Sequence, residues 1–141
     1  MSIRKMSRPA LRKWVDKLMA EKSVYAPQQR DDRFVYKRLE DSADLRLDYD
    51  VTILPPKKYL MPQRETLLKF SSQGQFESVL ETEDAVLFGV HPYDVAAIMQ
   101  MDQFFRQDNP DVHYLSKREK TAIVACDVQN PSANVFAGRS E

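Results

Sequence analysis

The alternation of apolar and polar residues is most informative between residues 83 and 129. Ala85–Val90 and Thr121–Cys126 are short, nearly continuous apolar runs, a pattern typical of strands buried on both faces. Apolar residues between positions 95 and 105 follow the i, i+3, i+4 spacing of a helix that buries one side. Pro92 is suited to the first turn of this helix. Two buried strands joined through a helix predict a parallel β-α-β unit.

Further helices are predicted on either side of this unit. Asn109-Pro110 ends the first helix, and residues 111–120 are expected to form a second, more polar one. Near the N-terminus, Ser7–Lys22 has a capping serine followed by an amphipathic pattern. Its apolar positions are spaced i, i+3, i+4 and i+7: Leu11, Trp14, Val15 and Leu18. The pattern predicts a surface helix packed on the sheet, with a partner-binding or membrane-lying helix as the alternative.

Residues 23–51 are predicted to form strands. Ser23–Gln28 and Arg33–Leu39 are rich in β-formers and are separated by a polar break. The second ends in basic residues, which indicates an edge strand of a hairpin. Leu45–Val51 alternates apolar and polar residues, the period of a half-buried strand.

Residues 54–80 are interrupted by prolines. Pro55-Pro56 and Pro62 are expected to hold residues 57–61 extended. Residues 63–70 can then form a short helix with Leu67, Leu68 and Phe70 available for burial. Phe76–Leu80 is predicted to be a further short strand.

Composition narrows the class of protein. The 141 residues suit one domain, and 21 basic residues balance 21 acidic ones. No net charge therefore favours nucleic acid as a partner, and no apolar segment is long enough to span a membrane. Cys126 is the single cysteine, which fits a reducing, cytoplasmic location. Even with His91 and His113, it is not expected to build a metal site.

The turn after Ala85–Val90 is the first candidate site. It brings His91, Tyr93 and Asp94 to the carboxyl end of a strand, where ligands bind in open α/β sheets. Cys126 would face the same crevice if the two strands are parallel neighbours. The turn lacks the G-x-G-x-x-G pattern of dinucleotide-binding proteins, and a buried inert thiol is favoured over a nucleophilic one.

A second candidate is a small anion site at Lys57, Lys58 and Arg64, since lysine and arginine are the usual anion partners. Solvated lysines on a structural segment are the favoured alternative. No catalytic residues are predicted, because no nucleophile–base or paired-carboxylate arrangement is recognisable from spacing.

Three segments resemble a known family: LPPKKYLMPQRE (54–65), FGVHPYDVAAIMQMD (88–102), and YLSKRE…IVACDVQNP between 114 and 131. In this order they resemble the N-terminal region of the iron–sulfur beta subunits of soluble nickel–iron hydrogenases (sulfhydrogenases). The A subunit of anaerobic sulfite reductase is related. The resemblance covers most of residues 45–136. It implies that a ferredoxin-like domain with 4Fe-4S clusters follows, which relays electrons between a flavin-bearing subunit and a catalytic subunit.

The chain departs from the family at the cysteines. A family cysteine is replaced by Tyr93 and a family arginine by His91, and the family's C-F-C segment falls on residues 134–137, which contain no cysteine. A single thiolate cannot hold a cluster, so no cofactor is expected within this chain. The ferredoxin-like domain is absent from the 141 residues, and the chain is expected to be the N-terminal part of a longer iron–sulfur subunit.

The sequence therefore predicts one α/β domain (α+β being possible), with a mixed sheet, a C-terminal β-α-β unit and an N-terminal amphipathic helix. The resemblance implies a non-cluster scaffold or docking domain of an electron-transfer subunit, in contact with other oxidoreductase subunits. The alternative is a domain that binds a flavin or nucleotide, or acts as an enzyme, at the crevice near His91. A third possibility is an orphan domain retained for assembly.

Overall fold

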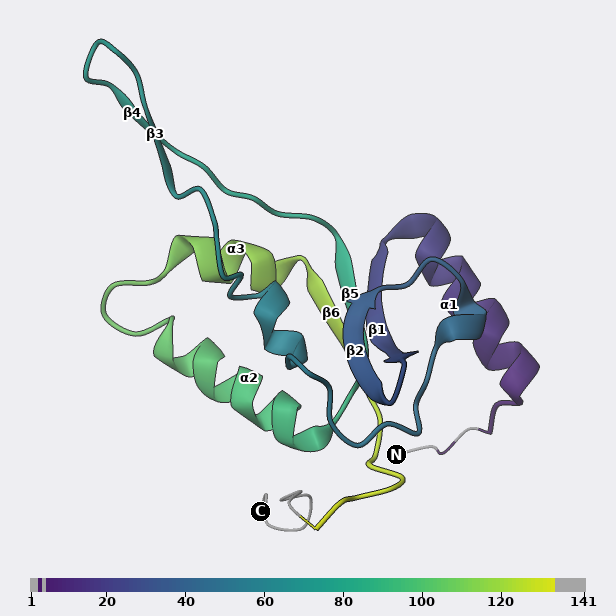
Figure 1. The fold of residues 1–141 in the computed structure, drawn as a ribbon. Coiled ribbons are helices and arrows are strands. Elements are labelled where there is room, and N and C mark those ends of the chain that lie inside the picture. Colours follow the sequence, from purple (N-terminus) through teal and green to yellow (C-terminus); the bar gives the residue numbers. More distant parts are fainter. Residues whose placement is uncertain (1–2, 4, 134–141) are drawn as a thin grey trace.

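A four-stranded mixed sheet organises the computed structural model, which describes residues 3 and 5–133 (Figure 1). Its strand order is β2-β1-β5-β6. These strands are β1 (Ser23–Arg30), β2 (Arg33–Arg38), β5 (Ala85–Val90) and β6 (Thr121–Ala125). β2 and β1 form an antiparallel hairpin, whereas β1, β5 and β6 run parallel. The predicted α/β class, mixed sheet and edge position of β2 are confirmed.

The predicted β-α-β unit is present. β5 and β6 are parallel neighbours, with Ala85 opposite Thr121. Helices α2 (Pro92–Phe104) and α3 (Val112–Glu119) connect them. All six residues of β5 are buried, as expected for a central strand covered on both faces.

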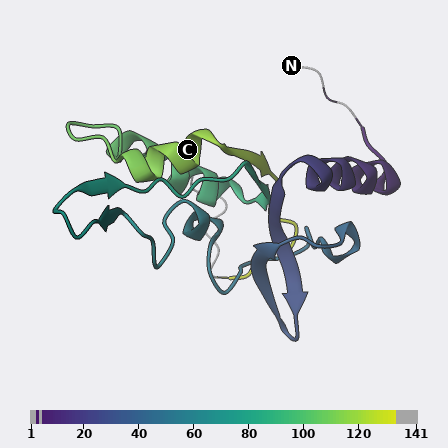
Figure 2. The same ribbon diagram turned by 90° about the horizontal axis from the view of Figure 1, so that it is seen from above.

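The helices cover opposite faces of the sheet. α1 (Arg8–Glu21) begins after Ser7, whose hydroxyl accepts a hydrogen bond from the Ala10 amide at 3.3 Å. Its apolar stripe packs against Val86 and Phe88, whereas Leu87 and Val90 face the side of Val95 in α2. Both views place α1 opposite α2 and α3 (Figure 1, Figure 2). The predicted packing of the N-terminal helix on the sheet is therefore confirmed, and no described helix is long and apolar enough to cross a membrane.

Leu87 and Val90 lie on the same side of the sheet although they are three residues apart, because β5 contains a bulge at Gly89. The register shifts between Phe88 and Val90, and Gly89 has a φ of +77°, a conformation that glycine adopts without steric cost. A Cβ at this position would lie 2.8 Å from Cδ2 of Leu47. The positive φ at the bulge favours glycine, and the close approach of the Leu47 side chain adds to this preference.

The strand predicted at Leu45–Val51 is wrong. The segment forms no β-ladder with another strand, although Tyr49, one of its alternating apolar residues, is buried. The Arg46 amide bonds to the Pro27 carbonyl and the Ile53 amide to the Phe34 carbonyl, each at 3.0 Å. Because these partners lie on two different strands, the segment crosses the sheet instead of extending it. A short 3₁₀ helix, η1 (Ser42–Asp44), precedes it.

Residues 54–80 also differ from the prediction. Pro56–Tyr59 forms a 3₁₀ helix, η2, where an extended segment was expected, because proline is tolerated at the start of a helix. The predicted helix over 63–70 does not form. Instead β3 (Leu68–Phe70) pairs with β4 (Phe76–Ser78), within the strand predicted at Phe76–Leu80. This β3–β4 hairpin projects from the body of the domain (Figure 1).

Candidate functional site

The predicted site at the end of β5 is a buried polar cluster. His91 is at the N-cap position of α2 and is 0% exposed. Its ring stacks on Tyr49, with centroids 3.9 Å apart and planes 5° apart. Tyr49 donates a hydrogen bond from its hydroxyl to the Gly89 carbonyl at 2.7 Å. The crossing segment thus places its own aromatic ring over the strand end where open α/β sheets usually admit ligands.

Hydrogen bonds fix the protonation of the imidazole. Nδ1 of His91 lies 2.8 Å from the Tyr93 hydroxyl, which donates to the Asp50 carbonyl at 3.0 Å. The single hydroxyl proton of Tyr93 is used in its bond to Asp50, so the hydrogen bond between Tyr93 and His91 must use a proton on Nδ1. Nε2 therefore carries no proton and can only accept. Nε2 is buried without a hydrogen-bond partner among the described residues. Burial lowers the pKa of His91, although Asp50 opposes the change, so the ring is neutral at pH 7.

The other two predicted residues have different surroundings. Asp94 lies in the first turn of α2, and burial raises the pKa of its carboxyl group, with Lys57 opposing. Cys126 follows β6, and its amide donates to the Val90 carbonyl at 2.9 Å. Burial, helped by Asp127, raises the pKa of its thiol to about 11. A protonated thiol is a poor nucleophile, which favours the inert interpretation. Binding of a ligand by these four residues stays a prediction.

The three residues of the predicted anion site lie in different environments. Lys58 donates from Nζ to the Tyr36 carbonyl at 2.6 Å, and burial lowers the pKa of its ammonium group. Lys57 borders a groove of about 590 Å³ next to α2. Arg64 is exposed in the segment that leads to the β3–β4 hairpin. The structure therefore gives Lys58 a structural hydrogen bond, and anion binding by the three residues stays a prediction.

A metal centre is not seen in the described part of the chain. No group of three or more histidine, cysteine, aspartate or glutamate side chains is arranged there to hold an ion. Residues 134–137, where the family's C-F-C segment would fall, lie outside the described residues.

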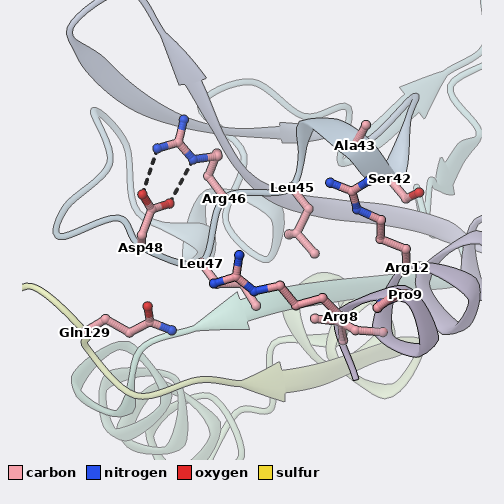
Figure 3. A pocket seen from close by; sticks show the side chains of 11 residues that line it. Arg8, Pro9, Arg12, Ser42, Ala43, Leu45, Arg46, Leu47, Asp48 and Gln129 are labelled. Atoms are coloured by element: carbon pink, nitrogen blue, oxygen red, sulfur yellow. Dashed lines mark hydrogen bonds and ion pairs between the residues drawn. The ribbon is translucent and has the colours of Figure 1, made fainter. Parts of the chain in front are cut away.

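Two features were missed from the sequence. The first is an apolar face on the β3–β4 hairpin: Phe70 and Phe76 are 74% and 73% exposed, and Leu67 and Leu68 are also exposed, although burial was predicted for three of these residues. The second is a cavity of about 740 Å³ between α1 and residues 42–48 (Figure 3). Its walls come from α1 and from residues 42–48, which are far apart in sequence, so no local spacing signalled it.

The comparison with curated proteins found one clear relative. The chain is 32% identical over 101 residues to the protein named "Sulfhydrogenase 2 subunit beta" of Pyrococcus furiosus. The match covers 72% of this chain but 30% of the relative. No family model matches the chain, and no solved structure matches it. The family resemblance inferred from the three sequence segments is confirmed, and the chain is a homologue of the sulfhydrogenase beta subunit over this region.

Proposed function

We propose that this chain is a docking domain, without clusters of its own, of a hydrogenase-like or sulfite-reductase-like oxidoreductase complex. It belongs, in this proposal, to the N-terminal part of a longer cytoplasmic iron–sulfur subunit whose 4Fe-4S clusters are carried elsewhere. The printed name of the relative, a subunit beta, supports assembly into a complex. The single cysteine supports the absence of clusters, because one thiolate cannot ligate them.

The β3–β4 hairpin is the observation that carries the proposal. Phe70 pairs with Phe76, and Leu68 pairs with Ser78. Because side chains alternate between the faces of a strand, Leu68 and both phenylalanines share one face. The opposite face carries the cross-strand pair Lys69 and Glu77.

This arrangement lacks a core of its own. A two-stranded hairpin is marginally stable in water unless another element covers it, and all six residues of β3 and β4 are exposed. An exposed apolar face of this kind marks an interaction surface. We assign it to contact with another subunit of the complex, flavin-bearing or catalytic.

The test compares the two faces of the hairpin. The tagged chain is expressed in its native host as wild type, as Phe70→Ser/Phe76→Ser, and as the control Lys69→Ser/Glu77→Ser. Wild type and control should retain flavin-bearing or catalytic oxidoreductase subunits, identified by mass spectrometry, and the phenylalanine variant should lose them. Equal retention by both variants, or a wild type without such subunits, would refute docking through this face.

The absence of clusters is tested separately on the purified 141-residue chain. It should be colourless and contain no stoichiometric iron or sulfide. Stoichiometric iron and sulfide would contradict the proposal, whatever the result for the hairpin.

A small-ligand site at the strand end is the second candidate function. Nε2 of His91, which has no hydrogen-bond partner within residues 5–133, favours it, whereas the stacked Tyr49 covers the ring. Saturable binding of flavin mononucleotide or ATP that is abolished by His91→Ala and by Asp94→Ala would support this function. Featureless titrations would remove its support.

A further inference from the structure

The cavity between α1 and residues 42–48 has the features of a small-molecule site. Its volume of about 740 Å³ lies within the range of roughly 300–1,000 Å³ typical of ligand pockets. Leu11, Leu45 and Leu47 provide an apolar lining. Such a surface suits the apolar body of a ligand.

Three arginines supply positive charge to the same cavity: Arg8, Arg12 and Arg46. Arg8 and Arg12 are four residues apart on α1 and therefore share a side of the helix. Figure 3 shows them reaching from α1 toward the segment that carries Leu47 and Ser42. Arg46 belongs to the opposite wall, and its side chain turns toward Asp48 and Gln29.

The charges in the cavity are not balanced. Arg46 makes two hydrogen bonds to Asp48, at 2.8 and 2.7 Å, and Asp48 is the only carboxylate that the described residues contribute to the cavity lining. Arg8 and Arg12 make no ion pair with any described residue. Two guanidinium groups therefore remain available, and guanidinium binds phosphate and carboxylate through paired N–H donors.

Ser42 adds a hydroxyl group to the same cavity. It lines the cavity and is only 9% exposed as a residue, but its hydroxyl oxygen is not among the buried polar atoms that lack a partner, so solvent reaches it. A hydroxyl that borders an arginine-lined cavity is suited to donate to an anionic oxygen.

The wall that carries Ser42 is held in place by its own contacts. The Asp41 carboxylate accepts from the Ala43 amide at 2.8 Å, and the Arg46 amide donates to Pro27 at 3.0 Å. Asn130 approaches the Asp48 carbonyl at 3.4 Å. Preorganised walls reduce the ordering cost of binding.

We propose that this cavity binds a small molecule in which a phosphate or carboxylate group is attached to an apolar body. Arg8, Arg12 and Ser42 contact the anionic group, and the leucine lining contacts the apolar part. This site goes beyond the proposed docking function and does not depend on it.

The experiment is calorimetric titration of the 141-residue chain with four probes. 1-Naphthyl phosphate and 1-naphthoate carry the two anionic groups, inorganic phosphate lacks the apolar body, and 1-naphthol lacks the charge. Wild type should bind one of the two aromatic anions with 1:1 stoichiometry, and the preferred one identifies the anionic group. Inorganic phosphate and 1-naphthol should each bind at least about tenfold more weakly.

Variants of α1 provide the matched comparison. Arg8→Ala/Arg12→Ala removes both free guanidinium groups, whereas Lys13→Ala/Lys17→Ala removes the same charge from exposed residues outside the cavity. The arginine variant should weaken binding by about tenfold or more and the lysine variant by less than about twofold. No saturable binding by wild type, equal weakening in both variants, or equal affinity for 1-naphthol would overturn the proposal.

Discussion

Replacing Gly89 by alanine tests the bulge that shapes the end of the central strand. Gly89 has a φ of +77°, and a left-handed conformation costs a residue with a Cβ about 1–2 kcal/mol. The added Cβ would also lie 2.8 Å from Cδ2 of Leu47, closer than a van der Waals contact. Because that atom ends a flexible side chain, relief requires a small movement, which adds about 1 kcal/mol. We expect Gly89→Ala to lower the free energy of unfolding by about 2–3 kcal/mol.

Leu47→Ala separates the two contributions. It removes the atom that clashes but leaves the backbone conformation unchanged, so Gly89→Ala in this background should cost only about 1–2 kcal/mol. The difference between the two values is the interaction energy of a double-mutant cycle.

Urea denaturation followed by tryptophan fluorescence measures this cycle. Trp14 is the single tryptophan, and its ring contacts Phe88, the neighbour of Gly89, edge-on at 5.4 Å between centroids. A Gly89→Ala effect within about 0.5 kcal/mol of zero would refute the strain argument. An equal effect with and without Leu47→Ala would refute the steric part alone.

Three further predictions concern the polar cluster at the strand end. Tyr49→Phe should destabilise the fold by about 1–3 kcal/mol in chemical denaturation, because the buried Gly89 carbonyl loses its donor; an unchanged denaturation midpoint would contradict this. Because the pKa of His91 is lowered in the folded state, the unfolded state binds the proton more tightly. The contribution of neutral His91 to the free energy of unfolding is therefore full above about pH 6.5 and is lost as the pH falls below that value. Stability measured from pH 7.5 to 5 should therefore fall more steeply in wild type than in His91→Gln, and parallel curves would be inconsistent with a depressed pKa. Cys126 should react with iodoacetamide at pH 7.5 about a hundredfold more slowly than a free cysteine peptide, because the pKa of its thiol is raised from 9.0 to about 11. Alkylation of both samples, quenched at a series of times, measures the two rates, and equal rates would contradict the raised pKa.

Local patterns in the sequence were sufficient for the β5–α2–β6 unit and for α1. The apolar run of β5 is continuous because both faces of this strand are covered, and Ser7 and Pro92 mark helix starts through capping and proline geometry. The family relationship was also readable, since its motifs are contiguous segments. These features depend on residues that are close in sequence.

The rest was decided by contacts between distant segments. The alternation of residues 45–51 predicts a half-buried strand, and Tyr49 is indeed buried while Val51 is exposed. Whether a neighbouring strand accepts the backbone depends on where the segment runs. Here it crosses the strand ends, which buries His91 beneath Tyr49. Similarly, the cavity joins Arg8 and Arg12 of one helix to Ser42 in a separate segment. The sequence by itself determined the β5–β6 unit with its helices, α1 and the family relationship. Only the tertiary structure placed Tyr49 over His91 and brought Arg8 and Arg12 next to residues 42–48, because packing partners far apart in sequence leave no local period.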